Sequence, residues 1–258
     1  MKKLAAFALL MCCFQGCLAQ SQATQSNQPA TTGQATPADN SQPAEQTPKQ
    51  NLQERAPVVC IDPGHPSETS DGKVVQNGTT EVHIAWVVGL KLKTLLEAAG
   101  IKVVMTKARE EQVVTNKERA MIANLAKAGV MIRLHCDVST DSGYAIYSPD
   151  RQGTVQGVTG PAWEVITQSK VAADIVHKGM AQVLEGVLKD GGVRGDSKTF
   201  VGSKQGALTG SIFSQVPAVL VEMVVLSNTL DAEFIKTDDG QMKMAKAIAE
   251  GITLYLKP

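Results

Sequence analysis

Three short, almost entirely apolar runs limit the folds open to this chain. They lie at residues 58–61, 130–134 and 217–221. Runs of this length, without alternation of apolar and polar residues, are typical of strands buried on both faces of a sheet. Helical spacing of apolar residues separates them, over 81–99 and again after a capping-box pattern at Thr115. We therefore predict an α/β fold whose central sheet is mixed, mainly parallel and of about six strands, covered by helices on both faces.

The rest of the sequence continues this alternation of strands and helices. Gly100 supplies a stop for the first helix, and Gly129 ends the second before the next apolar run. Two connections, 148–160 and 202–210, are long enough to be functional loops at the rim of a site. Further strands are expected at 101–105, 144–147 and 199–201, and further helices at 162–188 and 241–256.

Ionisable residues follow the apolar runs or open a helix. The first run leads to His65, the second to His135 and the third to Glu222, while Glu81 opens the first predicted helix. Placing such groups at the ends of buried strands is unfavourable unless a metal or a partner compensates, and ligands of open α/β folds bind at the carboxyl ends of strands. Two histidines and one carboxylate are a known ligand set for catalytic zinc, and the other carboxylate would then be the base.

Four blocks of the sequence also resemble a known family in the order that the family has them. They are VVCIDPGH at 58–65, the helix opened by Glu81, and the segments 116–138 and 216–228. These blocks are similar to those of the zinc-dependent N-acetylmuramoyl-L-alanine amidases with the type 3 catalytic domain, which cleave bacterial peptidoglycan. The resemblance frames nearly all of residues 56–258.

The resemblance implies a role for each of four residues. His65, Glu81 and His135 stand at the positions of the family's Zn²⁺ ligands, and Glu222 at that of its general base. The implied activity is hydrolysis, by zinc-activated water, of the amide between the N-acetylmuramoyl lactyl group and L-alanine of the stem peptide. Two alternatives stay open: a zinc peptidase acting on another amide, and an amidase-fold wall-binding or scaffold protein with little or no activity.

Two aspartates are candidates for orienting the metal ligands. Zinc-bound histidines commonly donate their second N–H to a carboxylate or a carbonyl, and Asp62 and Asp137 lie close in sequence to His65 and His135. The alternative for each is an ordinary turn or surface aspartate.

Two other histidines and both domain cysteines are expected outside the site. His83 is two residues from Glu81 on a helix and so lies on another face, and His177 belongs to an amphipathic helix. Cys60 and Cys136 read as small buried residues. Cys136 as a zinc ligand is the weaker alternative, because adjacent strand residues point to opposite faces.

The first 55 residues predict export and anchoring. Residues 1–16 have the charged and apolar regions of an export signal, too short to span a membrane. We expect lipidation at Cys17, with ordinary signal-peptidase cleavage nearby as the alternative. Residues 17–55 are rich in Gln, Ser, Thr and Pro and predict a disordered tether, and 56–258 form the catalytic domain.

Charge composition limits the classes of partner that the chain can be expected to bind. The chain has 25 Lys and Arg against 25 Asp and Glu, without a basic patch that would favour nucleic acid. The expected partner is peptidoglycan in the cell envelope, on the periplasmic side, with membrane contact only through the lipid anchor. The sequence leaves open whether a protein activator is needed.

Overall fold

The computed structural model describes residues 58–257. The predicted export signal at 1–16, the lipidation site Cys17 and the tether at 17–55 lie outside the described residues. Among the helices of residues 58–257, none combines the length and the apolar character that a membrane span requires.

A six-stranded sheet, in the order β2-β1-β3-β8-β4-β7, forms the centre of this domain. Strand β4 is antiparallel to β8, and the other neighbouring strands are parallel. The predicted mixed, mainly parallel sheet is therefore confirmed. Its strands are β1 (Val58–Pro63), β2 (Lys102–Met105), β3 (Val130–Asp137), β4 (Tyr144–Ser148), β7 (Asp190–Gly195) and β8 (Ala218–Val225), and a separate hairpin pairs β5 (Gly153–Val155) with β6 (Val158–Gly160).

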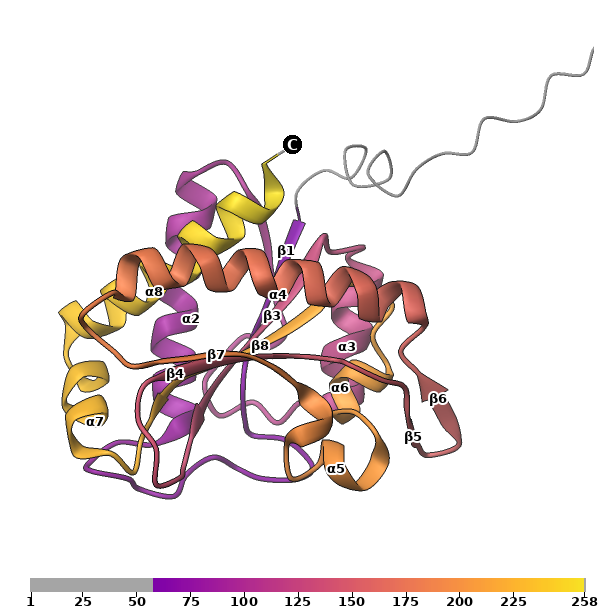
Figure 1. Cartoon of the computed structure of the whole chain (residues 1–258), viewed down its shortest axis with the longest axis horizontal. Coiled ribbons are helices and arrows are strands. Elements are labelled where there is room, and N and C mark those ends of the chain that lie inside the picture. Colours follow the sequence, from indigo (N-terminus) through magenta and orange to yellow (C-terminus); the bar gives the residue numbers. More distant parts are fainter. Residues whose placement is uncertain (1–57, 258) are drawn as a thin grey trace, which may run out of the picture. The chain divides into compact units, whose positions relative to one another are not determined.

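Helices cover both faces of the sheet, as the sequence predicted. Helix α8 packs against α2 and α4 on one face, while α3 and α6 contact each other on the opposite face. Figure 1 shows α4 along one side of β4 and β7, with α5 and α6 on their other side. The helices are α2 (Glu81–Ala98), α3 (Asn116–Leu125), α4 (Trp163–Leu184), α5 (Gly202–Gln205), α6 (Thr209–Ile212), α7 (Thr229–Lys236) and α8 (Asp238–Leu256), with a 3₁₀ turn at Asp196–Lys198.

Alternation along the strands sorts their side chains between two cores. Val59 and Ile61 of β1 point into the large core under α2, α4 and α8, whereas Cys60 points into a smaller core beside α3. Each fully buried aliphatic side chain contributes about 1.5–3 kcal/mol, which fixes the register of the strands. The residues that follow Cys60 and Met131 at even spacing, namely Asp62, Arg133 and His135, consequently face the α3 side.

Three sequence predictions need correction. Residues 199–201 do not form a strand; the edge strand is β7, Asp190–Gly195, whose glycines weaken the strand pattern. Helix α4 ends at Leu184 rather than at residue 188. Strand β8 continues to Val225, so Glu222 lies inside the strand and not at its end.

The two predicted rim connections contain ordered elements. Residues 148–160 include the β5–β6 hairpin, and 202–210 include α5 and the start of α6. The capping box at Thr115 is confirmed, because its side chain and that of Glu118 each accept from the other's backbone N–H.

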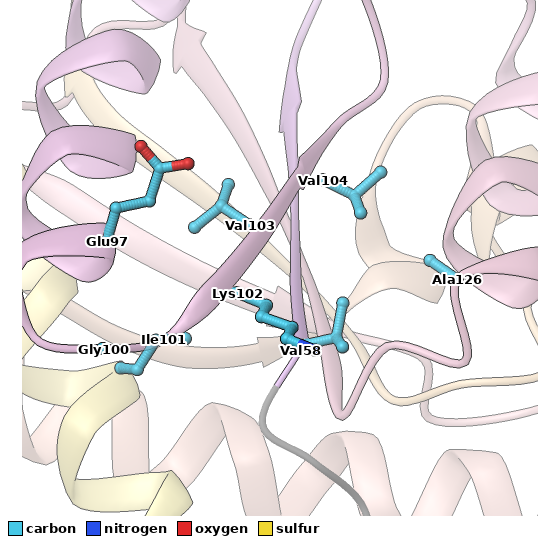
Figure 2. Close-up of a pocket in the computed structure, with 8 residues that line it drawn as sticks. All are labelled: Val58, Glu97, Gly100, Ile101, Lys102, Val103, Val104 and Ala126. Atoms are coloured by element: carbon cyan, nitrogen blue, oxygen red, sulfur yellow. The ribbon is translucent and has the colours of Figure 1, made fainter.

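A hollow of about 530 Å³ lies beside the edge strand β2. It is lined by residues from the end of α2, the α2–β2 connection and β2, together with Val58 and Ala126 (Figure 2). Val58 begins β1, whereas His65 follows the other end of that strand. None of the four predicted site residues lines this hollow.

Candidate metal centre

Strand pairing brings the second histidine and the proposed base together. His135 of β3 is paired in register with Glu222 of β8, and Glu222 is paired in turn with Ala145 of β4. Residues paired in register point to the same face of a sheet. His135 and Glu222 are therefore neighbours on the face that carries Asp62 and Arg133.

The first histidine reaches this face through a tight turn after β1. The N–H of Gly64 donates to the carbonyl of Leu134 at 2.9 Å, so the turn stays attached to β3. A Cβ at Gly64 would lie 2.6 Å from the His135 ring, and one at Gly72 would lie 2.6 Å from the Cβ of His65. The two histidine rings can approach to a centroid distance of 5.1 Å because these positions lack side chains.

Glu81 lies between the two histidines. It is the first residue of α2, whose N-cap is Thr80. Its Oε2 is 3.1 Å from Nε2 of His65, and its Oε1 is 2.8 Å from Nδ1 of His135. Ligand atoms of His65, Glu81 and His135 all lie within 4.8 Å of one another, the one such group of potential metal ligands in residues 58–257.

The donor atoms fit a zinc ion. Two imidazoles and one carboxylate are an established ligand set for catalytic zinc. Among the described residues, Nε2 of His135 and Oε2 of Glu222 are buried without any hydrogen-bond partner. A buried polar atom without a partner is costly, and two of them at one place indicate a group that they bind. In addition, Nδ1 of His65 lies 3.2 Å from the carbonyl of Ser70, which can orient the ring.

Burial and hydrogen bonding shift the pKa values of the candidate ligands. Burial alone would raise the pKa of Glu81, but hydrogen bonds from His135 and His65 and their charges outweigh burial and hold that pKa well below its ordinary value. Burial lowers the pKa of His135 despite the neighbouring Glu81. His135 is thus held neutral, the form in which imidazole binds a metal, and Glu81 is held ionised.

Glu222 has the opposite electrostatic environment. Burial raises its pKa well above the ordinary value, and the carboxylates of Glu81 and Asp137 raise it further. Two neighbouring carboxyl groups therefore have pKa values shifted in opposite directions, a pattern typical of sites where one group binds and another transfers protons.

The structure gives Asp62 a different role from the one its position suggested. Its carboxylate accepts from Nη1 of Arg119 at 2.6 Å and from Nε of Arg133 at 2.9 Å, and the hydroxyl of Thr106 donates to it at 2.6 Å. These contacts do not include His65 or His135. The expectation that Asp62 accepts from a metal-binding histidine is wrong because two buried arginines occupy its oxygens.

Sequence reasoning missed the cations that hold the His65 turn. Arg119 donates to the carbonyls of Pro63 at 2.7 Å and Pro66 at 2.8 Å. The buried ammonium of Lys107 donates to the carbonyls of Gly64 and His65. Carbonyls of four consecutive residues are therefore fixed by two side chains. The sequence did hold one signal of buried charge near the turn, because Arg133 is a charged residue within an otherwise apolar run.

Asp137 and the two other histidines of the domain have partners of their own. The carboxylate of Asp137 accepts from the N–H of Val138 at 2.7 Å. His83 lies 3.3 Å from Glu110, and His177 lies 2.8 Å from Asp190. 

Both cysteines of the described domain are buried and free. Cys60 belongs to the small core and Cys136 to the large one, so their side chains lie on opposite faces of the sheet. The prediction that both are small buried residues is confirmed.

Comparison with known proteins identifies the family of this chain. The model of the N-acetylmuramoyl-L-alanine amidase family matches residues 59–254. The chain is 24% identical over 222 residues to an N-acetylmuramoyl-L-alanine amidase of Mycobacterium tuberculosis, covering 77% of this chain and 86% of that protein. It is 25% identical over 247 residues to the amidase AmiC of Neisseria meningitidis, covering 85% of this chain but 57% of the relative.

Among solved structures, the catalytic domain of the N-acetylmuramoyl-L-alanine amidase CwlV from Bacillus (Paenibacillus) polymyxa superposes with a TM-score of 0.61. That comparison has 26% sequence identity and covers 78% of this chain and 98% of the other. With a family match that spans most of its length and a related fold, this chain belongs to the N-acetylmuramoyl-L-alanine amidase family.

Proposed function

We propose that this protein is a zinc-dependent peptidoglycan hydrolase that cleaves the amide between the lactyl group of N-acetylmuramic acid and L-alanine of the stem peptide. The observation that carries the proposal is the cluster of His65, Glu81 and His135 beside Glu222. It supplies three ligands and a separate carboxylate, which is what metal-assisted amide hydrolysis requires.

His65, Glu81 and His135 would hold the zinc ion. Bound zinc supplies Lewis acidity, which polarises a carbonyl oxygen and lowers the pKa of water. The residues present fit this ion because one histidine is held neutral and the carboxylate between the rings is held ionised.

Glu222 is the proposed general base and general acid. Its raised pKa makes its ionised form a better proton acceptor than an ordinary carboxylate. It takes a proton from the attacking water as the water oxygen bonds to the lactyl carbonyl carbon. It then gives that proton to the amide nitrogen as the carbon–nitrogen bond breaks. The products are a glycan with a free lactyl carboxylate and a peptide with a free L-alanine amino group.

Anchoring of the enzyme is part of the proposal. Lipidation at Cys17 would attach the chain to a membrane, and the tether that follows would average about 35 Å end to end, with an extended limit of about 120 Å. The catalytic domain would thus reach nearby cell wall. A Cys17→Ala variant is expected to leave the membrane fraction, and unchanged fractionation would contradict the anchor.

The activity is tested with insoluble peptidoglycan. The purified protein is incubated with it, with and without a zinc chelator, and the released fragments are identified by mass spectrometry. We expect free stem peptides that begin with L-alanine, and we expect the chelator to prevent their release. Glu222→Gln serves as the control for contaminating hydrolases. Fragments cut at another amide would overturn the proposed substrate. If no fragments were released at all, a wall-binding protein would be favoured instead.

A further inference from the structure

A strip of small residues extends from Glu222 across the sheet. Glu222 is paired with Ala145 of β4, and the next strand, β7, carries Gly191 opposite that position. A Cβ at Gly191 would lie 3.1 Å from the Cβ of Ala145 and 3.1 Å from Nη2 of Arg194. Ala145, Gly191 and the Arg194 guanidinium therefore share the face of Glu222. Tyr147, two residues from Ala145 on β4, lies on the same face beside this arginine.

Arg194 is held at the far edge of the strip by neutral groups. Its Nη1 donates to the hydroxyl of Tyr147 at 3.2 Å, and its Nε donates to the carbonyl of Gly191 at 3.1 Å. The guanidinium also lies over the Tyr147 ring, with Cζ 5.9 Å from the ring centroid. The side chain is exposed yet fixed in direction, which lowers the entropy cost of binding an anion.

Within residues 58–257, Arg194 forms no ion pair with a carboxylate, unlike the cations around it. Arg133, on the same face of the sheet, is paired with Asp62, and Lys189 is paired with Asp141 at 2.5 Å. A fixed, exposed guanidinium with no carboxylate partner next to a candidate cleavage site is suited to bind an anionic group of the substrate.

We infer that Arg194, positioned by Tyr147, binds a carboxylate of the peptide that leaves on cleavage, and so sets a preference for acidic stem peptides. This inference rests on the proposed function. The lactyl carboxyl of the substrate is an uncharged amide, so the anionic groups lie on the peptide side of the bond. In peptidoglycan the first of them is the α-carboxylate of the γ-linked D-glutamate that follows L-alanine, which some walls carry as the neutral amide.

The separation fits such a contact. Arg194 is two strands from Glu222 and about two residues farther along, because Arg194 pairs with Tyr147 and Tyr147 with Leu220. With strands about 4.8 Å apart and a rise of about 3.3 Å per residue, their Cα atoms are about 12 Å apart. Two extended residues of the stem peptide span at most about 7 Å, and the Arg194 side chain bridges the rest of the distance to Glu222.

The test compares two substrates that differ by one charge. Glycan strands that carry identical stem peptides with either D-glutamate or its neutral amide after L-alanine are digested, and kcat/KM is measured for each. We expect the wild-type protein to prefer the acidic substrate by about tenfold, the worth of one charge-assisted hydrogen bond. In Arg194→Gln, kcat/KM should fall for the acidic substrate only. Arg194→Lys should restore part of the preference.

Lys178→Gln is the matched control, since it removes one positive charge from an exposed position on α4, over the opposite face of the sheet. It should leave the preference unchanged. The amidated substrate reports separately whether each variant is intact. Equal cleavage of both substrates by the wild type, or an equal loss on both in Arg194→Gln, would refute the inference while the proposed function stands. Failure of the wild type on both substrates would instead refute the proposed function.

Discussion

Replacing Asp196 with asparagine should change how stability depends on pH. This residue lies in the 3₁₀ turn after β7, and only 1% of it is exposed. Its Oδ2 accepts from the N–H of Leu208 at 3.2 Å, whereas its Oδ1 has no partner within the described residues. Burial, joined by the charge of Asp150, raises its pKa from 3.8 to about 6, against the opposing effects of Ser211, Leu208 and Arg133.

The pKa difference sets the size and the sign of the effect. A carboxyl pKa of about 6 in the folded protein, in place of 3.8, corresponds to about 3 kcal/mol. Because the folded-state pKa is the higher one, the folded protein holds the proton more tightly. The stability from this residue is therefore complete below about pH 4 and is lost as pH rises through about 6. An asparagine stays neutral, so the variant does not lose this stability as the pH rises.

Urea unfolding between pH 4 and pH 8 measures the effect directly. The free energy of unfolding of Asp196→Asn, minus that of the wild type, should increase by about 2.5 kcal/mol across this range. Asp174→Asn is the control, because Asp174 is exposed on α4 and pairs with Lys170. Parallel pH profiles of wild type and Asp196→Asn would refute the reasoning, since they would mean that Asp196 ionises at its ordinary pKa inside the fold.

Three further changes test the site and its support. Glu222→Gln should lower the rate of amide hydrolysis by about 100-fold or more while bound zinc, measured by elemental analysis, is retained; loss of the metal instead would assign Glu222 to the ligands. Asp62→Ala should lower the free energy of unfolding by about 3–5 kcal/mol in urea, because it leaves the buried Arg119 and Arg133 unpaired, and a loss under 1 kcal/mol would contradict that account. Gly64→Ala should weaken zinc binding in a chelator competition by about tenfold or more, because the new Cβ would lie 2.6 Å from the His135 ring, while circular dichroism stays unchanged. Wild-type affinity in that variant would show that the turn can move aside.

The sequence predicted the central sheet because its inner strands are apolar on both faces. Residues 58–61 and 130–134 carry this signal without interruption except at Arg133. Edge strand β7 was not predicted because Gly191, Gly192 and Gly195 give it neither apolar content nor alternation. An edge strand pairs on one side only, so its sequence is under less constraint than that of β3.

The site was predictable as a set of residues but not as a set of contacts. His65, Glu81 and His135 come together because strand ends and a helix start converge, and local sequence patterns report such ends. Glu222 was placed correctly beside them but at the end of its strand, although β8 runs on to Val225. The partners of Asp62 were unpredictable, since its contacts with Arg119 and Arg133 span 57 and 71 residues of sequence.

These long-range contacts explain how the turn after β1 can hold His65, a candidate metal ligand, in place. The His65 turn contains a residue with positive φ and lies outside β1, so backbone pairing alone does not fix it. Arg119 fixes two of its carbonyls, and Asp62 makes the burial of Arg119 tolerable by neutralising it. The buried ion pair therefore supports the candidate metal centre through the backbone of the turn, and the carbonyl of Ser70 is left to orient the His65 ring. A carboxylate one strand residue away from the turn thus supports a histidine that it does not contact.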